Sequence, residues 1–247
     1  MKYCLYLALI ICSLSCTSDV KQQAGKNVEK KEGNKNTLSL KFANPSELDS
    51  STYVIYPLVL NDEEGESDSY GSSSGNRSTT YWNIAFYNTA NGTYHLLDEN
   101  RKMVIYHYDQ KESGNSSSSN KEDSNIYSEI NKFIYYSITT LDFNKDERLD
   151  FLDPTYLFIS DKNGEHFKQV SPDNGNVYEW KAIAKTNKIL MMVAFDSNKD
   201  KKFNNEDKII PMVYDLNTNT ISKEIFKADF KSKVEDLFNK KWAFKAK

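Results

Sequence analysis

The chain has 247 residues, of which 38% are apolar, 27% are charged and 13% are aromatic. This length suffices for one large domain or two small ones with a sizeable hydrophobic core. The 16 tyrosines and 13 phenylalanines favour strands, and the 9 glycines and 5 prolines are too few for a collagen-like or fully disordered chain. A net charge of −3 gives no electrostatic support to a nucleic-acid partner.

The N-terminus has the pattern of an export signal. A short basic start precedes an apolar run, residues 5–11, that is too short to span a bilayer. The segment Ser13-Leu14-Ser15-Cys16 then resembles the signal of bacterial lipoproteins, although Ser13 stands where leucine is usual. The resemblance implies that residues 1–15 are removed and that Cys16 becomes the lipidated N-terminus. An ordinary secretory signal cut nearby is the alternative.

The cysteines agree with lipidation. All three lie in this segment, so the mature chain would keep Cys16 alone and would have no disulfide, even in an oxidising compartment. The resemblance implies a lipid-anchored protein of the cell envelope whose partner is the membrane, and Thr17 after the cysteine favours the outer membrane. Residues 16–36 are predicted to be the lipidated N-terminus and a disordered tether, because 17–36 are polar and lack periodicity. A single β-rich domain with a C-terminal helix is expected at 37–247.

Alternation of apolar and polar residues predicts an all-β fold of three repeats. Each repeat has four short antiparallel strands, with a polar loop between its second and third strands. The expected strands are 38–42, 53–60, 83–87 and 94–97, then 103–108, 133–142, 156–161 and 166–170, then 177–184, 188–196, 209–216 and 221–226.

Two phrases, LFISDKNGEHFKQVSP at 157–172 and PMVYDLNTNTISKE at 211–224, resemble the repeats of TolB-type β-propellers. The resemblance implies four-stranded meanders like propeller blades, and it implies no particular activity. Natural propellers close with about four to eight blades, so three repeats imply an open arc, a sandwich, or a ring shared between two chains. A plain β-sandwich of short strands is the alternative.

Beyond the third repeat the periodicity changes to that of a helix. Apolar residues recur at intervals of three and four, with charged residues between them, at Phe230, Val234, Leu237, Phe238 and Trp242. We expect a C-terminal helix docked on the sheets. The alternative is a basic helix that lies on a membrane surface.

Two of the polar loops have the spacing of a calcium loop, with carboxylate or amide oxygens at positions one, three, five, nine and twelve. Both resemble the EF-hand and dockerin type of loop, in which position seven contributes its backbone carbonyl. The predicted cofactor is calcium, bound weakly. The candidate ligands are Asp142, Asn144, Asp146, Arg148, Asp150 and Asp153 in the second repeat, and Asp196, Asn198, Asp200, Lys202, Asn204 and Asp207 in the third.

The loops depart from the EF-hand pattern. Glu147 and Lys201 occupy position six, where an EF-hand has glycine for a sharp turn, and position twelve is the shorter aspartate. The alternation in the flanking segments predicts strands and not the paired helices of an EF-hand. The alternative interpretation is that Asp, Asn and Lys are simply common in turns. The corresponding loop of the first repeat, 61–80, is acidic but lacks the spacing, and we predict a flexible loop without a metal there.

A catalytic constellation is not evident in the sequence. His95 and His166 occupy like positions on the last strands of two repeats, which indicates packing or surface and not chemistry. We therefore expect a calcium-binding envelope lipoprotein that binds a protein or glycan partner or acts as a scaffold, rather than an enzyme.

The alternative function is an envelope hydrolase or a carbohydrate-binding protein with a cleft in the first repeat. Three aromatic residues of the chain, Trp82, Trp180 and Tyr178, could line a sugar site, although aromatic residues at strand spacing are more often core.

Overall fold

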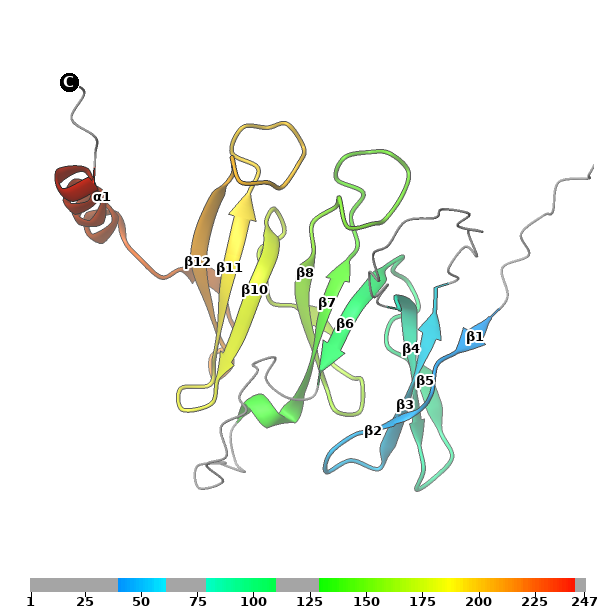
Figure 1. The fold of residues 1–247 in the computed structure, drawn as a ribbon. Coiled ribbons are helices and arrows are strands. Elements are labelled where there is room, and N and C mark those ends of the chain that lie inside the picture. Colours follow the sequence, from blue (N-terminus) through cyan, green and yellow to red (C-terminus); the bar gives the residue numbers. More distant parts are fainter. Residues whose placement is uncertain (1–39, 61–78, 110–128, 243–247) are drawn as a thin grey trace, which may run out of the picture. The chain divides into compact units, whose positions relative to one another are not determined.

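The computed structural model describes residues 40–60, 79–109 and 129–242, all within one unit, Leu38–Lys247. In these residues every strand pairs antiparallel with its neighbours (Figure 1). One sheet has nine strands: β1 (Lys41–Phe42), β2 (Ser46–Glu47), β3 (Tyr53–Val59), β4 (Tyr81–Asn88), β5 (Tyr94–Leu96), β6 (Val104–Asp109), β7 (Phe133–Thr139), β8 (Tyr156–Asp161) and β9 (Lys168–Gln169). The other has four: β10 (Asn176–Ile183), β11 (Lys188–Phe195), β12 (Lys208–Asp215) and β13 (Thr220–Glu224).

The predicted all-β fold of antiparallel meanders with a C-terminal helix is confirmed; β6–β9 and β10–β13 have four strands each, and the stretch β1–β5 also contains the short extra strand β2. We call β1–β5 the first meander, β6–β9 the second and β10–β13 the third. The first and second meanders join into one sheet through a single registered pair, Tyr81 on β4 with Ile105 on β6. The third meander forms its own sheet in the order β10-β11-β12-β13. Within the described residues neither sheet closes into a barrel, which fits the open arrangement.

Two hydrophobic cores lie on opposite faces of the second meander. One core includes Tyr136 and Phe158 of the second meander, and Ile55 and Phe86 of the first. The other core takes the alternate residues of β7 and β8, among them Tyr135 and Leu157, and packs them against β10, β11 and β12 of the third meander. In the second core the rings of Tyr135 and Trp180 stack with centroids 4.9 Å apart.

The sequence of the second meander explains its central place. Strands β7 (FIYYSIT) and β8 (YLFISD) have almost no polar alternation, and nearly all of their residues are buried. A strand that is apolar on both faces is stable only when both faces are covered. The hydroxyl of Tyr136, buried in this layer, hydrogen-bonds the Ser160 hydroxyl 2.7 Å away, which satisfies both groups.

Several strand ends differ from the prediction. β8 has the predicted bounds, whereas β1 and β9 shrink to two residues each. The short strand β2 and a 3-10 helix, η1 (Glu129–Lys132), were not predicted. β2 has two residues and η1 has four, so both are too short to leave a periodic pattern in the sequence.

The C-terminal helix forms as α1 (Ala228–Trp242), but the expectation that it docks on the sheets is wrong in this structure. None of its residues is buried, including the five apolar residues that predicted the docking. Helical periodicity indicates that one face is apolar, and it does not indicate what covers that face. Among the described residues, no helix has the length and apolar character needed to cross a membrane.

Some predictions fall outside the described residues. They are the signal, the lipidated Cys16, the tether and most of the acidic loop at 61–80.

Candidate functional site

The two candidate calcium loops occupy equivalent places in the second and third meanders. The first loop, residues 142–153, connects β7 to β8, and the second, residues 196–207, connects β11 to β12. Both loops rise at the same end of their sheets (Figure 1). Strands flank both loops, as the alternation in the sequence predicted.

The first half of each loop is organised around the carboxylate at position one. In the first loop the Asp142 carboxylate accepts hydrogen bonds from the backbone N–H of Asp146 at 3.1 Å and of Glu147 at 2.8 Å. In the second loop Asp196 accepts the equivalent bonds, from Asp200 at 3.1 Å and Lys201 at 3.2 Å.

Positions three and five follow the same rule. The side-chain oxygens of Asn144 and Asn198 each accept from the N–H at position five, at 2.9 and 3.1 Å. The carboxylates of Asp146 and Asp200 accept from the N–H of position seven, Arg148 and Lys202, at 3.0 and 2.9 Å. The oxygen-bearing positions predicted from spacing are therefore the positions that hold the loop backbone.

The aspartate at position twelve of each loop accepts hydrogen bonds from the backbone at positions two and nine. Asp153 is buried, and its two carboxylate oxygens accept from the N–H of Phe143 at 2.8 Å and of Asp150 at 3.2 Å. Asp207 is buried in the same way and accepts from Ser197 at 2.9 Å and Asn204 at 3.0 Å. A buried carboxylate is costly unless it is hydrogen-bonded, so each of these groups ties the two ends of its loop together.

Position nine completes the correspondence. The side-chain oxygen of Asp150 accepts from the N–H of Leu152 at 2.9 Å, and that of Asn204 accepts from the N–H of Glu206 at 2.7 Å. The backbone carbonyl of position nine also accepts from the N–H of position twelve, at 3.1 Å in both loops. The two loops thus share one hydrogen-bond pattern, made by the positions at which their sequences agree.

The sharp turn that glycine makes in an EF-hand is present without glycine. Glu147 and Lys201 at position six have φ of 70° and 61°, and the lysines at position four, Lys145 and Lys199, have φ of 65° and 63°. A residue with a side chain in this left-handed region costs about 1–2 kcal/mol. The carboxylate hydrogen bonds of each loop offset that strain.

The oxygen chemistry of the loops suits a hard cation, but the carboxylates do not converge by themselves. Within residues 40–60, 79–109 and 129–242, no three Asp, Glu, His or Cys side chains form a group that could hold a metal ion. Each carboxylate accepts backbone N–H groups and retains lone pairs, because its two oxygens have about four acceptor sites. An ion would therefore need the asparagine oxygens, the carbonyl of position seven or water in addition.

The loops also meet each other. The rings of Phe143 and Phe203, one from each loop, lie with centroids 5.2 Å apart. A cavity of about 540 Å³ lies between the loops, and Asn144, Asp153 and Asp200 are among its lining residues. The sequence did not predict this contact, because the two phenylalanines occupy different positions, two and eight, of their loops.

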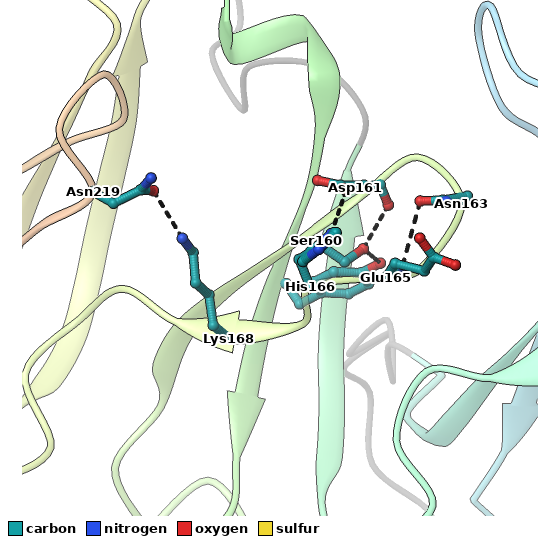
Figure 2. Close-up of polar contacts among 8 residues, drawn as sticks. Ser160, Asp161, Asn163, Glu165, His166, Lys168 and Asn219 are labelled. Atoms are coloured by element: carbon teal, nitrogen blue, oxygen red, sulfur yellow. Dashed lines mark hydrogen bonds and ion pairs between the residues drawn. The ribbon is translucent and has the colours of Figure 1, made fainter.

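The histidines lie outside these loops. His166 is exposed in the turn before β9, and its Nδ1 lies 2.7 Å from Asp161 Oδ2 (Figure 2). Ser160 is next to Asp161 in sequence, but its buried hydroxyl is shared between Tyr136 and the Asp161 backbone carbonyl. This serine is therefore not placed as a nucleophile beside the histidine. His95 on β5 packs between the rings of Tyr53 and Phe86, so both histidines have the packing or surface roles expected.

A groove of about 960 Å³ lies on the first meander, on the face opposite its core. Register places Phe42 with Leu58 and Tyr87 with Tyr94 on this face, and Tyr56 and Trp82 also line the groove. Of the three aromatic residues considered for a sugar site, only Trp82 lies here. Trp180 packs against Tyr135 in the core, and Tyr178 is exposed on β10.

Comparisons of the chain with family models, with curated proteins and with solved structures find no match.

Proposed function

We propose that this chain is a calcium-binding, lipid-anchored protein of the cell envelope that serves as a binding or scaffold module and not as an enzyme. The observation that carries the proposal is the shared hydrogen-bond pattern of the two loops, position by position. If these residues were present only because turns favour Asp, Asn and Lys, we would not expect the two loops to use side-chain oxygens at the same positions for the same hydrogen bonds.

The charge of the loops supports a cation. The first loop has carboxylates at Asp142, Asp146, Asp150 and Asp153, and calcium prefers six to eight such hard oxygen ligands. Without an ion these charges repel each other within a short segment. A calcium ion would offset the repulsion and connect two neighbouring strands, a task that disulfides perform in many exported proteins.

A thermal melt tests the calcium proposal. Calcium at ten times its Kd adds about 1.4 kcal/mol of stability per site, which corresponds to a rise in Tm of about 3–6 °C per site for a domain of this size. Chelator should reverse the rise, and magnesium should do less because it demands a smaller octahedral shell.

The matched variants are Asp142→Asn with Asp196→Asn, and Glu165→Gln as a control. The double variant removes the carboxylate at position one of both loops and should abolish the calcium shift. Glu165→Gln neutralises an exposed acid in the turn before β9 and should keep the full shift. A wild-type melt that ignores both calcium and chelator would mean that these loops are ordinary turns.

Lipid anchoring has a separate test. Cys16→Ala removes the only sulfur that the proposed mature chain could use for acylation, and multiple acyl chains are what make an anchor firm. The variant should move from the membrane fraction to the soluble fraction. Both forms are washed at high salt, which releases proteins held on membranes by charge. A Cys16→Ala variant that resists this wash as well as the wild type would contradict lipidation.

The second candidate function is an envelope hydrolase or carbohydrate-binding protein whose cleft lies in the first repeat. The aromatic groove on the first meander favours it, because flat apolar rings with hydroxyl groups can contact sugar faces and edges together. Screening the protein against glycans and esters tests this candidate. Trp82→Ala should abolish any binding found, and Tyr178→Ala, an exposed aromatic outside the groove, should not.

A further inference from the structure

Trp82 lies in a β-bulge that turns its ring away from the core. Leu58 on β3 pairs with Asn83, and the next residue, Val59, pairs with Tyr81. Trp82 is therefore the extra residue of β4. Regular alternation along β4 would place Trp82 on the core face, whereas the bulge places Tyr81 against the core and leaves Trp82 36% exposed. Bulges re-aim side chains in this way beside binding sites.

The re-aimed Trp82 ring borders two cavities. One is the aromatic groove on the first meander, of about 960 Å³. The other, which we call the basic pocket, has a volume of about 480 Å³ and is lined by residues of three segments. These segments are β4 with Trp82, the stretch before β6 with Arg101 and Lys102, and the first loop with Arg148 and Asp150. A ligand that lies across Trp82 would contact both cavities.

Positive charge exceeds negative charge in the basic pocket. Arg101, Lys102 and Arg148 line it, together with a single acid, Asp150. The Nε of Arg101 lies 3.4 Å from Oδ2 of Asp98, which neutralises part of its charge. With Asp98 included, three cations are set against two acids, so the pocket keeps a positive excess.

Lys102 and Arg148 carry the charge that a ligand could use. Both are exposed, and neither forms an ion pair within the part of the chain that the structure describes. The backbone N–H of Arg148 donates to Asp146 inside the first loop, but its guanidinium has no part in the loop's hydrogen-bond pattern. The loop therefore fixes the backbone of Arg148 and leaves the guanidinium for another partner.

We propose that the first meander binds an acidic glycan, with its sugar rings along the aromatic groove and a carboxylate or phosphate group in the basic pocket. The inference rests on the second candidate function above and names its ligand class. Guanidinium and ammonium groups form strong charge-assisted hydrogen bonds with such anions. The aromatic rings contact sugar faces, and the carboxylates of Glu99 and Asp150, which line the groove and the pocket, accept hydrogen bonds from sugar hydroxyls.

A nucleic acid fits this surface less well than an acidic glycan. Nucleic acids carry a phosphate on every unit, and proteins that bind them neutralise several phosphates with lysine and arginine. Here three cations are confined to one pocket, the groove itself contains Glu99, and the net charge of the chain is −3.

Matched acidic and neutral glycans test the proposal. The full chain is titrated calorimetrically with fragments of galacturonan, alginate and hyaluronan, in chelator so that calcium cannot bridge protein and ligand. The methyl ester of the galacturonan fragment keeps its rings and removes its charge. A phosphorylated mannan oligosaccharide and its dephosphorylated form make a second pair. In at least one pair the acidic form should bind about tenfold or more tightly than the neutral form, and raised salt should narrow the difference. The pair with the larger difference distinguishes carboxylate from phosphate.

Variants separate the pocket from the groove. Arg148→Gln and Lys102→Gln should each weaken the acidic ligand about tenfold and leave the neutral form unchanged, because each removes a charge-assisted hydrogen bond. Trp82→Ala and Tyr94→Ala should weaken both forms alike, because they remove ring contacts; Tyr94 is 82% exposed, so its loss does not disturb the core. The control Lys185→Gln removes an exposed cation between β10 and β11 and should change nothing.

The outcomes distinguish this inference from the function on which it rests. Equal affinity for acidic and neutral forms would overturn the acidic assignment and leave carbohydrate binding in place, as would an acidic affinity that Arg148→Gln and Lys102→Gln do not change. If no glycan binds, both are overturned. Tighter binding of a single-stranded DNA oligonucleotide, abolished by the same variants, would assign the site to nucleic acid instead.

Discussion

Replacing Gly164 with alanine tests how closely the first and second meanders pack. Gly164 lies in the turn between β8 and β9 with φ of 82°, and a Cβ there would lie 2.7–2.9 Å from three ring atoms of Phe86. Phe86, on β4, is fully buried in the core that the first and second meanders share. The left-handed backbone costs about 1–2 kcal/mol for alanine, and overpacking a core costs about 1–3 kcal/mol more. We expect Gly164→Ala to lower the free energy of unfolding by about 2–5 kcal/mol.

The chain offers a matched control at Gly92. This glycine lies in the turn before β5 with φ of 76°, and a Cβ there would meet nothing within 4 Å. Gly92→Ala should therefore cost the backbone strain alone, about 1–2 kcal/mol, or about 2–8 °C in Tm. Urea unfolding followed by circular dichroism gives both values. If Gly164→Ala is no more destabilising than Gly92→Ala, the contact with Phe86 does not exist as described.

A double variant isolates the contact further. In the background of Phe86→Ala the three ring atoms nearest to Gly164 are gone, although the truncated side chain leaves a cavity with its own cost. Gly164→Ala should then cost only about 1–2 kcal/mol, and the difference between the two backgrounds measures the coupling. Strict additivity would refute the steric argument.

The remaining predictions concern the second meander and its borders. Burial, and secondarily the charges of Asp173 and Asp153, raises the pKa of Tyr156 to about 12, so the neutral phenol is favoured in the folded state. The stability that the neutral Tyr156 phenol contributes is complete below pH 10 and is lost as pH rises through 12. Tyrosinate absorbance should show Tyr156 titrating together with unfolding. Tyr135→Phe should cost about 1–3 kcal/mol in urea unfolding, because the buried Ile130 carbonyl loses its 3.0 Å hydrogen bond from the hydroxyl. Lys168→Ala should change stability by less than about 1 kcal/mol, since its bond to Asn219 is exposed (Figure 2); a larger loss in the same assay would assign it a structural role.

Local chemistry made much of this fold predictable. The bounds of β8 follow from an apolar run that ends at a turn with Gly164, and the loops at 142–153 and 196–207 follow from their oxygen spacing. What the sequence did not reveal depends on contacts between distant segments. The sheet that joins the first two meanders depends on one pair, Tyr81 with Ile105, and a single pair leaves no periodic pattern.

For the candidate site too, local features were predictable from the sequence, whereas contacts between distant segments were not. Spacing identified which loop residues carry the organising oxygens, because a hydrogen bond over a few residues is encoded locally. The meeting of Phe143 with Phe203 depends on how the second and third meanders stack, which alternation cannot specify. The groove on the first meander was likewise foreseen only through Trp82, since its other aromatic residues come from several strands.

The central position of the second meander has a consequence for the order in which the chain can fold. The inner faces of the first and third meanders both pack on strands within residues 133–161, from opposite sides. A nascent chain that ends before this stretch has nothing on which the first meander can bury Ile55 and Phe86, whereas a chain that ends after β9 can complete that core. The third meander can only be added afterwards, so folding should proceed outward from the middle of the chain, and a fragment ending at residue 109 should remain unfolded while one ending at residue 172 retains native strands.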